Sequence, residues 1–230
     1  MSEVNLKPET YPGRAVAKKK KYTRLKSRKA LQSILRAGDK LLGGDGYRVH
    51  LINGDFDFRN TEEVDLHWPL DGSMEFVEKG RKAPTICEFT PYAVAKASKI
   101  AMALNQANHR DDFLEQDFPI RIRADENGLH LAAFRRAVGS MEFTLSDGLV
   151  WKLKSSKRKH RYEFKAEEPI EIFVQAQFLY DATLSMNDMV LRMVSNRKGV
   201  YLANELAEYE AYIMPMDPEQ CAKAFEKAGL

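Results

Sequence analysis

One order of expected elements occurs three times in this chain and restricts its fold more than any other feature: a strand, a helix and a meander of short strands. The second occurrence is the clearest. Its strand is "TICEF" at 85–89, and Thr90 followed by Pro91 is a helix N-cap with proline at the first helical position. Strand candidates then follow at 118–125, 129–136 and 140–146. Short strands separated by tight turns predict an α+β fold with antiparallel sheets, not a parallel α/β fold.

The helices of the three occurrences are amphipathic. The first is expected over 24–42, ahead of strand candidates that include "SMEFVEK" at 73–79. The second, expected from Pro91 to about 105, should bury Ala93, Ala97, Ile100 and Leu104. The third lies in "QAQFLYDATLSM" at 175–186, between strands at 162–174 and strands at 189–216. Each unit would bury one sheet face under its helix.

These patterns divide the chain into four parts. Residues 1–22 are expected to be a flexible basic tail, because they contain Lys18 to Lys21 and lack apolar periodicity. Residues 23–84 form the first unit, and residues 85–216 form a domain of two units. Residues 217–230 are an extension in which Asp217 and Pro218 predict a helix start, with Ala222 and Phe225 on one side.

The composition excludes several classes of protein. No apolar run approaches the roughly 20 residues that a membrane crossing requires, and the N-terminus has no signal-peptide pattern, so we expect a cytoplasmic protein. The two cysteines and five histidines are not spaced as metal ligands, so neither a metal site nor a cofactor is expected. A net charge of +3 is too small to indicate nucleic-acid binding by itself.

Basic side chains do gather on particular faces. The first two expected helices carry cations on one side, and the loop at 152–165 is densely basic. These residues could meet phosphates without reading bases, although a solvated helix face or hairpin tip would look the same. The candidate DNA contacts are Lys26, Lys29, Arg36, Lys40, Lys96, Lys99, Lys157, Arg158 and Lys159.

The segment 168–216 resembles the closing half of the bacterial beta sliding clamp. The order of elements is the same: a strand ending in "IFV", a helix containing "FLYDAT", a strand "VLRMV", a hairpin and a last strand ending in Met-Pro-Met. The resemblance implies a ring with helices around a central hole and sheets outside. Such rings contain about twelve helices, so three per protomer would give a homotetramer, and four would give a trimer.

The resemblance also implies the partners. A clamp of this family is a DNA polymerase processivity factor that encircles double-stranded DNA, and polymerase and clamp loader dock on it through short peptide motifs. It is not an enzyme. The client pocket would map onto Tyr212, Ile213, Met214, Pro215 and Met216. The extension from Asp217 could cover that pocket, extend it or seal a subunit contact. Edge strands would close the ring, and "SMEFVEK" and "SMEFTLS" are candidates.

Two other functions remain open at this point. A non-ring DNA-binding or regulatory protein could use the basic first helix. A small metal-dependent nuclease could use an acidic run, but its members flank turns and alternate with apolar residues as solvent-facing strand positions do. That run consists of Asp55, Asp57, Glu62, Glu63 and Asp65.

Overall fold

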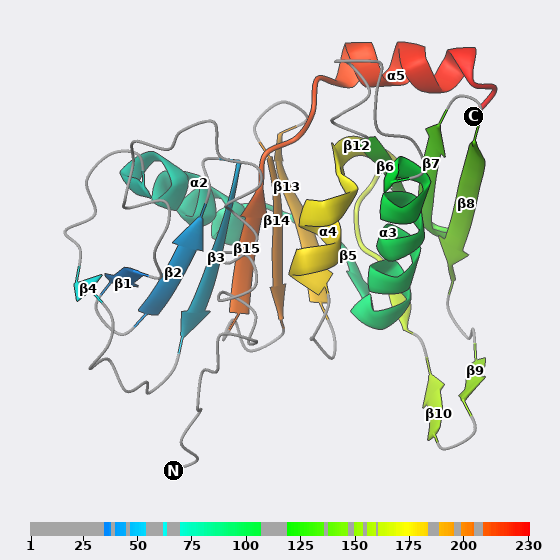
Figure 1. Ribbon diagram of the computed structural model, residues 1–230. Helices are drawn as coiled ribbons and strands as arrows, with labels where there is room; N and C mark the ends of the chain where they lie inside the picture. The colour runs from blue at the N-terminus through cyan, green and yellow to red at the C-terminus, as the bar shows by residue number, and fades with distance from the viewer. Residues whose placement is uncertain are drawn as a thin grey trace.

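The structure is a computed structural model of the 230-residue chain. It describes residues 35–37, 40–44, 47–53, 62–63, 70–106, 119–135, 138–146, 150–153, 156–159, 161–183, 189–195, 199–204 and 209–230. These residues form two main sheets, a separate hairpin and four helices (Figure 1). The expected α+β class with antiparallel strands is confirmed.

The larger sheet, called sheet A, contains strands from both ends of the chain. Its pairs are antiparallel except for β1 with β4. Because β15 pairs with β3, the N-terminal strands extend the sheet of the C-terminal unit. In spatial order the strands are β11 (Tyr162–Phe164), β5 (Thr85–Phe89), β13 (Met189–Ser195), β14 (Gly199–Asn204), β15 (Tyr209–Ile213), β3 (Arg48–Asn53), β2 (Lys40–Gly44), β1 (Leu35–Ala37) and β4 (Glu62–Glu63).

The smaller sheet, called sheet B, has four antiparallel strands in the order β12 (Ile170–Gln175), β6 (Pro119–Asp125), β7 (Gly128–Arg135) and β8 (Gly139–Leu145). The "SMEFTLS" segment therefore lies on an edge strand, as expected. Beyond it, β9 (Val150–Leu153) and β10 (Ser156–Lys159) pair as a separate hairpin at the lower right of Figure 1.

Two helices lie side by side against the inner faces of both sheets (Figure 1). They are α3 (Pro91–Gln106) and α4 (Ala176–Thr183). Their buried faces join one core with Ile86 and Phe89 of β5, Ile120 and Ile122 of β6, and Leu202 of β14. The helix start predicted from Thr90-Pro91 and the helix predicted within "QAQFLYDATLSM" are confirmed.

A third helix, α2 (Leu70–Lys82), covers the other face of sheet A. Strand residues alternate between faces, so Val200 and Leu202 enter the core with α3 and α4, whereas Tyr201 and Ala203 pack beneath α2. Gly80 allows α2 to approach sheet A closely, because a Cβ at this position would come within 2.6 Å of the Tyr201 side chain. Sheet A is thus covered on both faces.

The last helix, α5 (Pro218–Lys227), lies across the outer face of sheet B, at the top of Figure 1. Asp217 is its N-cap, and the carboxylate accepts hydrogen bonds from Glu219 N at 2.9 Å and Gln220 N at 3.1 Å. The predicted helix start is confirmed. Its buried side chains are Cys221 and Phe225, one turn apart; Ala222, predicted on that side, is exposed.

The prediction of a helix over 24–42 is wrong for the residues of that range that the structure describes. From Leu35 onward the chain forms β1 and β2, which pair in the register of Ala37 with Lys40. In the sequence only Gly38 and Asp39 separate the two strands, and a two-residue connection starting with glycine is a hairpin signal that competes with helical periodicity. The described part of this segment therefore does not support the helix count behind the expected tetramer, and α2 packs on the opposite face of sheet A from α3 and α4.

Two further expectations are also wrong. The "SMEFVEK" segment belongs to α2, where Met74 and Val77 are three positions apart and face the sheet, so its alternation imitates a strand. In α3, Ile100 was expected to be buried but is 57% exposed. Val94, Ala97 and Ala101 make the contact instead, because the face toward the sheets is set by these small side chains.

Candidate functional site

The outward face of the α3–α4 pair carries two of the predicted basic residues. Lys96 and Lys99 are both exposed, as the sequence predicted, and Ile100 stands beside them. The Lys96 ammonium lies 5.3 Å from the centroid of the Tyr92 ring, a cation–π contact one helical turn away. Two exposed cations three positions apart on one side of a helix are suited to contact phosphates without reading bases.

The adjoining α4 has a buried charge that the sequence did not indicate. Asp181 is 3% exposed and accepts a hydrogen bond from Arg48 Nη1 of β3 at 2.6 Å. The Arg48 guanidinium also lies 4.4 Å from the centroid of the Phe178 ring. This ion pair joins α4 to sheet A across 133 positions of sequence, so that α4 is held in place.

The other predicted basic residues that the structure describes are not brought to this helix face. Lys26 and Lys29 lie outside the described residues. Arg36 lies on β1, where it pairs with Leu41, and Lys40 starts β2. In the separate hairpin, β10 holds the remaining three predicted residues, Lys157, Arg158 and Lys159. The acidic run considered for a nuclease is described only at Glu62 and Glu63 of β4.

The residues predicted to form a client pocket separate into different environments. Tyr212 and Ile213 are fully buried on opposite faces of sheet A. Met214 is 43% exposed beside Tyr47, itself 56% exposed, and its N–H donates a 2.8 Å hydrogen bond to the Tyr47 carbonyl oxygen. Met216 instead packs at the margin of α5. Among the described residues, the exposed apolar surface where β15 ends is therefore the Tyr47–Met214 pair, here called the Tyr47–Met214 edge.

This edge is supported from below by aromatic packing. The Tyr47 and Phe178 rings stack with centroids 6.5 Å apart, which connects the edge to α4. On the opposite face of β15, Tyr212 stacks on Phe76 of α2 at 5.2 Å. Burial raises the pKa of Tyr212 to about 12, so its phenol stays neutral at physiological pH. Pro215, which is half-buried, follows Met214 and stiffens the exit from the strand.

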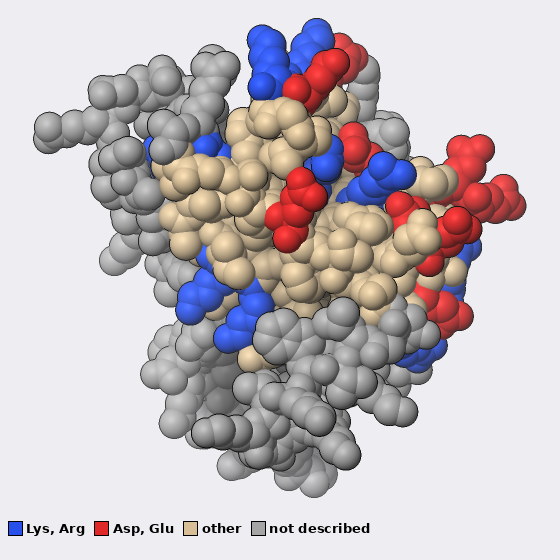
Figure 2. Space-filling model, turned by 90° about the vertical axis from the view of Figure 1, so that its right-hand side faces the viewer, with Lys and Arg blue, Asp and Glu red and all other residues tan. Residues whose placement is uncertain are grey.

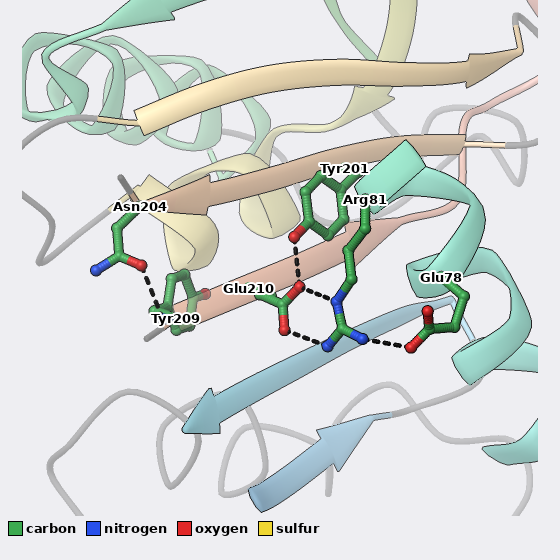
Figure 3. Close-up of polar contacts among 6 residues, drawn as sticks. All are labelled: Glu78, Arg81, Tyr201, Asn204, Tyr209 and Glu210. Carbon is green, nitrogen blue, oxygen red and sulfur yellow. Dashed lines mark hydrogen bonds and ion pairs between the residues drawn. The ribbon is translucent and has the colours of Figure 1, made fainter. Parts of the chain in front are cut away.

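A second ion pair that the sequence did not predict lies beneath α2 (Figure 3). Glu210 of β15 has 0% exposure, and Arg81 donates to both of its carboxylate oxygens at 2.6 Å. The Tyr201 hydroxyl and Glu78 complete the network. These hydrogen bonds raise the pKa of Arg81 above its ordinary value despite partial burial. The only sequence signal is the charged Glu210 inside an otherwise apolar strand.

Neither a membrane helix nor a metal cluster is found in the described ranges. None of their helices is long and apolar enough to cross a bilayer. Likewise, these ranges contain no group of three or more potential His, Cys, Asp or Glu ligands.

The sequence matches no protein-family model and no curated protein. Its structure is similar to solved sliding clamps. A DNA polymerase III beta-subunit clamp from Bartonella birtlesii, bound to griselimycin, has a TM-score of 0.56 at 13% identity, covering 85% of this chain and 60% of that one. A DNA polymerase sliding clamp from Pseudomonas aeruginosa has a TM-score of 0.56 at 12% identity, covering 79% and 56%.

The beta subunit from DNA polymerase of Streptococcus pyogenes has a TM-score of 0.54 at 11% identity, covering 84% of this chain and 60% of that one. The present chain thus spans between 56% and 60% of the length of these three proteins. The present chain has two sheets with a helix pair on their inner faces. This arrangement is the fold of DNA sliding clamps.

Proposed function

We propose that this protein is a DNA polymerase processivity factor: copies of it assemble into a ring around duplex DNA and tether a polymerase there. The observation that carries the proposal is the clamp fold, with α3 and α4 paired on one side of the two sheets. A ring of such units holds DNA by enclosure, so neither a catalytic residue nor a cofactor is required. Sequence-independent contact is sufficient.

The exposed face of α3 supports contact with the DNA backbone. In the proposed ring, α3 and α4 border the hole, and Lys96 and Lys99 of each copy approach phosphates. Such contacts release counterions, so affinity falls as salt increases. The absence of basic residues on α4 means that positive charge would alternate with neutral helix surface around the hole.

Ring closure would use strand edges. The β8 strand has seven residues and is the last strand of sheet B among the described residues, and an exposed edge of this length is a site for pairing with another copy. Pairing β8 with an edge of sheet A in the next copy would be a head-to-tail contact, the kind that generates rings. The mass of the assembly in solution would give the number of copies.

The Tyr47–Met214 pair is the proposed docking edge for a polymerase peptide. Methionine adapts to different apolar anchors, while Tyr47 offers a ring that is stacked on Phe178 and so is already positioned. The buried Tyr212 and Ile213 would support this edge from within. A client would contact Met214 without disturbing the core.

Retention on DNA tests the proposal. The chain, loaded on a nicked circular plasmid with the host's loader fraction, should co-elute with the circle in high salt and be lost after the plasmid is cut once. Enclosure predicts this difference, since a ring slides from a free end. Equal retention on circular and linear DNA would contradict enclosure and favour a non-ring DNA-binding protein.

A matched pair of double variants tests the DNA-facing helix. Lys96→Gln with Lys99→Gln should weaken the association with DNA at low salt several-fold and reduce its salt dependence, because phosphate contacts are lost. Lys223→Gln with Lys227→Gln removes the same charge from exposed positions of α5. This control should bind normally, and an equal loss in both variants would show that only net charge matters.

A further inference from the structure

The outer face of sheet B, opposite α3 and α4, carries rows of polar side chains that have no part in the proposed clamp function. The strand register places Arg123, His130 and Thr144 in one cross-strand row, with Arg121, Ala132 and Glu142 in the next. Phe225 of α5 covers one end of this face, packing on Phe173, Phe134 and Ala132. Elsewhere on this face Arg123, Glu142 and Thr144 are exposed.

A cavity of about 310 Å³ lies in this exposed part. Ala132 lies in its lining at the centre of a row, between Arg121 on β6 and Glu142 on β8. Two strand spacings separate β6 from β8, roughly 9.6 Å. The small side chain between a cation and an anion leaves room for a ligand, and the cavity is at the small end of the range for binding pockets.

The negative charge at the turn end of the cavity is already engaged. Asp125 is 6% exposed, and its Oδ1 is 2.9 Å from Asn127 N and 3.1 Å from His130 Nε2. Burial opposes its ionisation, but these hydrogen bonds and the charges of His130 and Arg123 outweigh it and lower the pKa of Asp125. His130 Nδ1 is 3.0 Å from the Thr144 hydroxyl, which fixes its ring.

Arg121 and Glu142, on the two sides of the cavity, are less engaged by other side chains than Asp125 is. Arg121 lies 5.2 Å from the Phe225 ring centroid and is 3.9 Å from its carboxylate partner Glu171, at the outer limit for an ion pair. Glu142 is exposed and forms no ion pair within the described part of the chain. The cavity therefore offers an arginine side and a glutamate side, with Ala132 between them and the Asp125–His130 pair at the turn end.

We propose that this cavity is a docking site for an extended peptide segment that carries an acidic and a basic side chain two positions apart. The acidic side chain pairs with Arg121 and Arg123, where it competes with Glu171 and with Asp125, whose Oδ2 lies 3.3 Å from Arg123 Nε. The basic side chain pairs with Glu142. Side chains at i and i+2 of an extended peptide lie on one face, about 6.6 Å apart along the backbone, and can reach both sides.

The mixed charge disfavours nucleic acid as the occupant. A phosphate backbone binds along a continuous positive groove. Figure 2, which views the molecule from the β8 side of Figure 1, shows basic and acidic side chains interspersed on this side. Glu142 would repel phosphates that bridge from Arg121. The site is separate from α3 and from the Tyr47–Met214 edge, so it does not depend on the clamp function.

The test uses blocked pentapeptides and two-dimensional NMR spectra of the isotope-labelled full chain. The probe Ac-Ala-Glu-Ala-Lys-Ala-NH2 should shift the amide signals of Asn127, Ala132 and Thr144 with a dissociation constant on the order of millimolar. Ac-Ala-Glu-Ala-Gln-Ala-NH2 should bind about fivefold more weakly, and the peptide with Gln at both positions should not bind measurably, because each loses an ion pair.

Two variants locate the charges. Glu142→Gln should weaken the Glu/Lys peptide about fivefold and leave the Glu/Gln peptide unchanged, whereas Arg123→Gln should weaken both. Both residues are exposed, but Arg123 also pairs with the buried Asp125 at 3.3 Å, so circular dichroism checks that each variant remains folded. The matched control Glu126→Gln, an exposed turn residue, should change neither affinity.

Three results would overturn the proposal. Equal amide shifts with the neutral peptide would show that the cavity does not recognise charge. An unchanged affinity of the Glu142→Gln variant for the Glu/Lys peptide would show that Glu142 does not pair with the lysine. A single-stranded oligothymidylate that shifts the same amides more strongly than the Glu/Lys peptide would identify the cavity as a nucleic-acid site instead.

Discussion

The two helices on the outward faces, α2 and α5, are attached in different ways. Both cover a sheet face that the helix pair leaves uncovered. Beneath α2, a fully buried Glu210 receives two hydrogen bonds from Arg81. Beneath α5, the contact consists of Phe225 and Cys221 on apolar side chains, with Arg121 against the Phe225 ring.

The difference teaches which face can be exposed at low cost. Separating α2 from sheet A would leave a buried carboxylate without its cation, which costs several kcal/mol. Separating α5 from sheet B exposes mainly one aromatic ring, about 1.5–3 kcal/mol of apolar burial. The face beneath α2 is therefore fixed, and the face beneath α5 can open locally.

Glu210→Ala should have the largest effect. It leaves Arg81 facing a partly buried space without its partner, so we expect a loss of about 3–5 kcal/mol in the free energy of unfolding. Urea denaturation followed by circular dichroism measures it. Glu78→Ala removes the exposed partner of the same arginine and should cost less than about 1 kcal/mol. Similar losses in the two variants would mean that burial of Glu210 does not matter.

Gly80→Ala should have an intermediate effect. Its Cβ would meet the Tyr201 ring at 2.6 Å, so α2 must shift outward and strain the Arg81–Glu210 hydrogen bonds, at a cost of about 1–3 kcal/mol. This outweighs the roughly 1 kcal/mol that alanine gains over glycine within a helix. The thermal midpoint should fall. A rise would show that α2 is not in close contact with sheet A.

Asp217→Ala should have the smallest effect, and it should be confined to α5. Loss of the N-cap destabilises the helix by about 1 kcal/mol. Burial raises the pKa of the Cys221 thiol to about 11 and raises that of Cys87 as well, so each reacts with a thiol reagent only when it becomes exposed. Labelling of Cys221 should become about fivefold faster, while labelling of Cys87, deep in the main core, stays unchanged.

The exposed Glu226→Ala variant is the control for that measurement, because it lies on the same helix without capping it. Equal acceleration at both cysteines in Asp217→Ala would mean that α5 opens only when the whole molecule unfolds. The contrast between α2 and α5 would then be wrong.

The predictions from sequence succeeded where a local signal was sufficient. Thr90-Pro91 and Asp217-Pro218 each mark a helix start, and the turn at Asn127 separates two confirmed strands. They failed where two periodicities overlapped. Met74 and Val77 fit a helix, but Met74 and Phe76 also alternate like a strand, and packing against Tyr201 and Tyr212 decides the outcome.

The candidate site was predicted only in part for the same reason. Exposure of Lys96 and Lys99 follows from helical spacing around Ala97, which a sequence displays directly. The pairing of Arg81 with Glu210 spans 129 positions, and that of Arg48 with Asp181 spans 133. Contacts at such separations depend on the tertiary arrangement, which the sequence pattern does not display. The different surroundings of Tyr212, Met214 and Met216 depend on the same arrangement.

The short passage from β15 to α5 has a mechanical consequence. Met214 N–H bonds to sheet A at Tyr47, and Met216 N–H bonds to sheet B at Phe173, with the stiff Pro215 between them. Two residues extend at most about 7 Å, so the two sheets cannot separate far while both bonds remain. If the protein forms a ring that opens to admit DNA, the opening must therefore occur between neighbouring copies and not between the sheets of one copy.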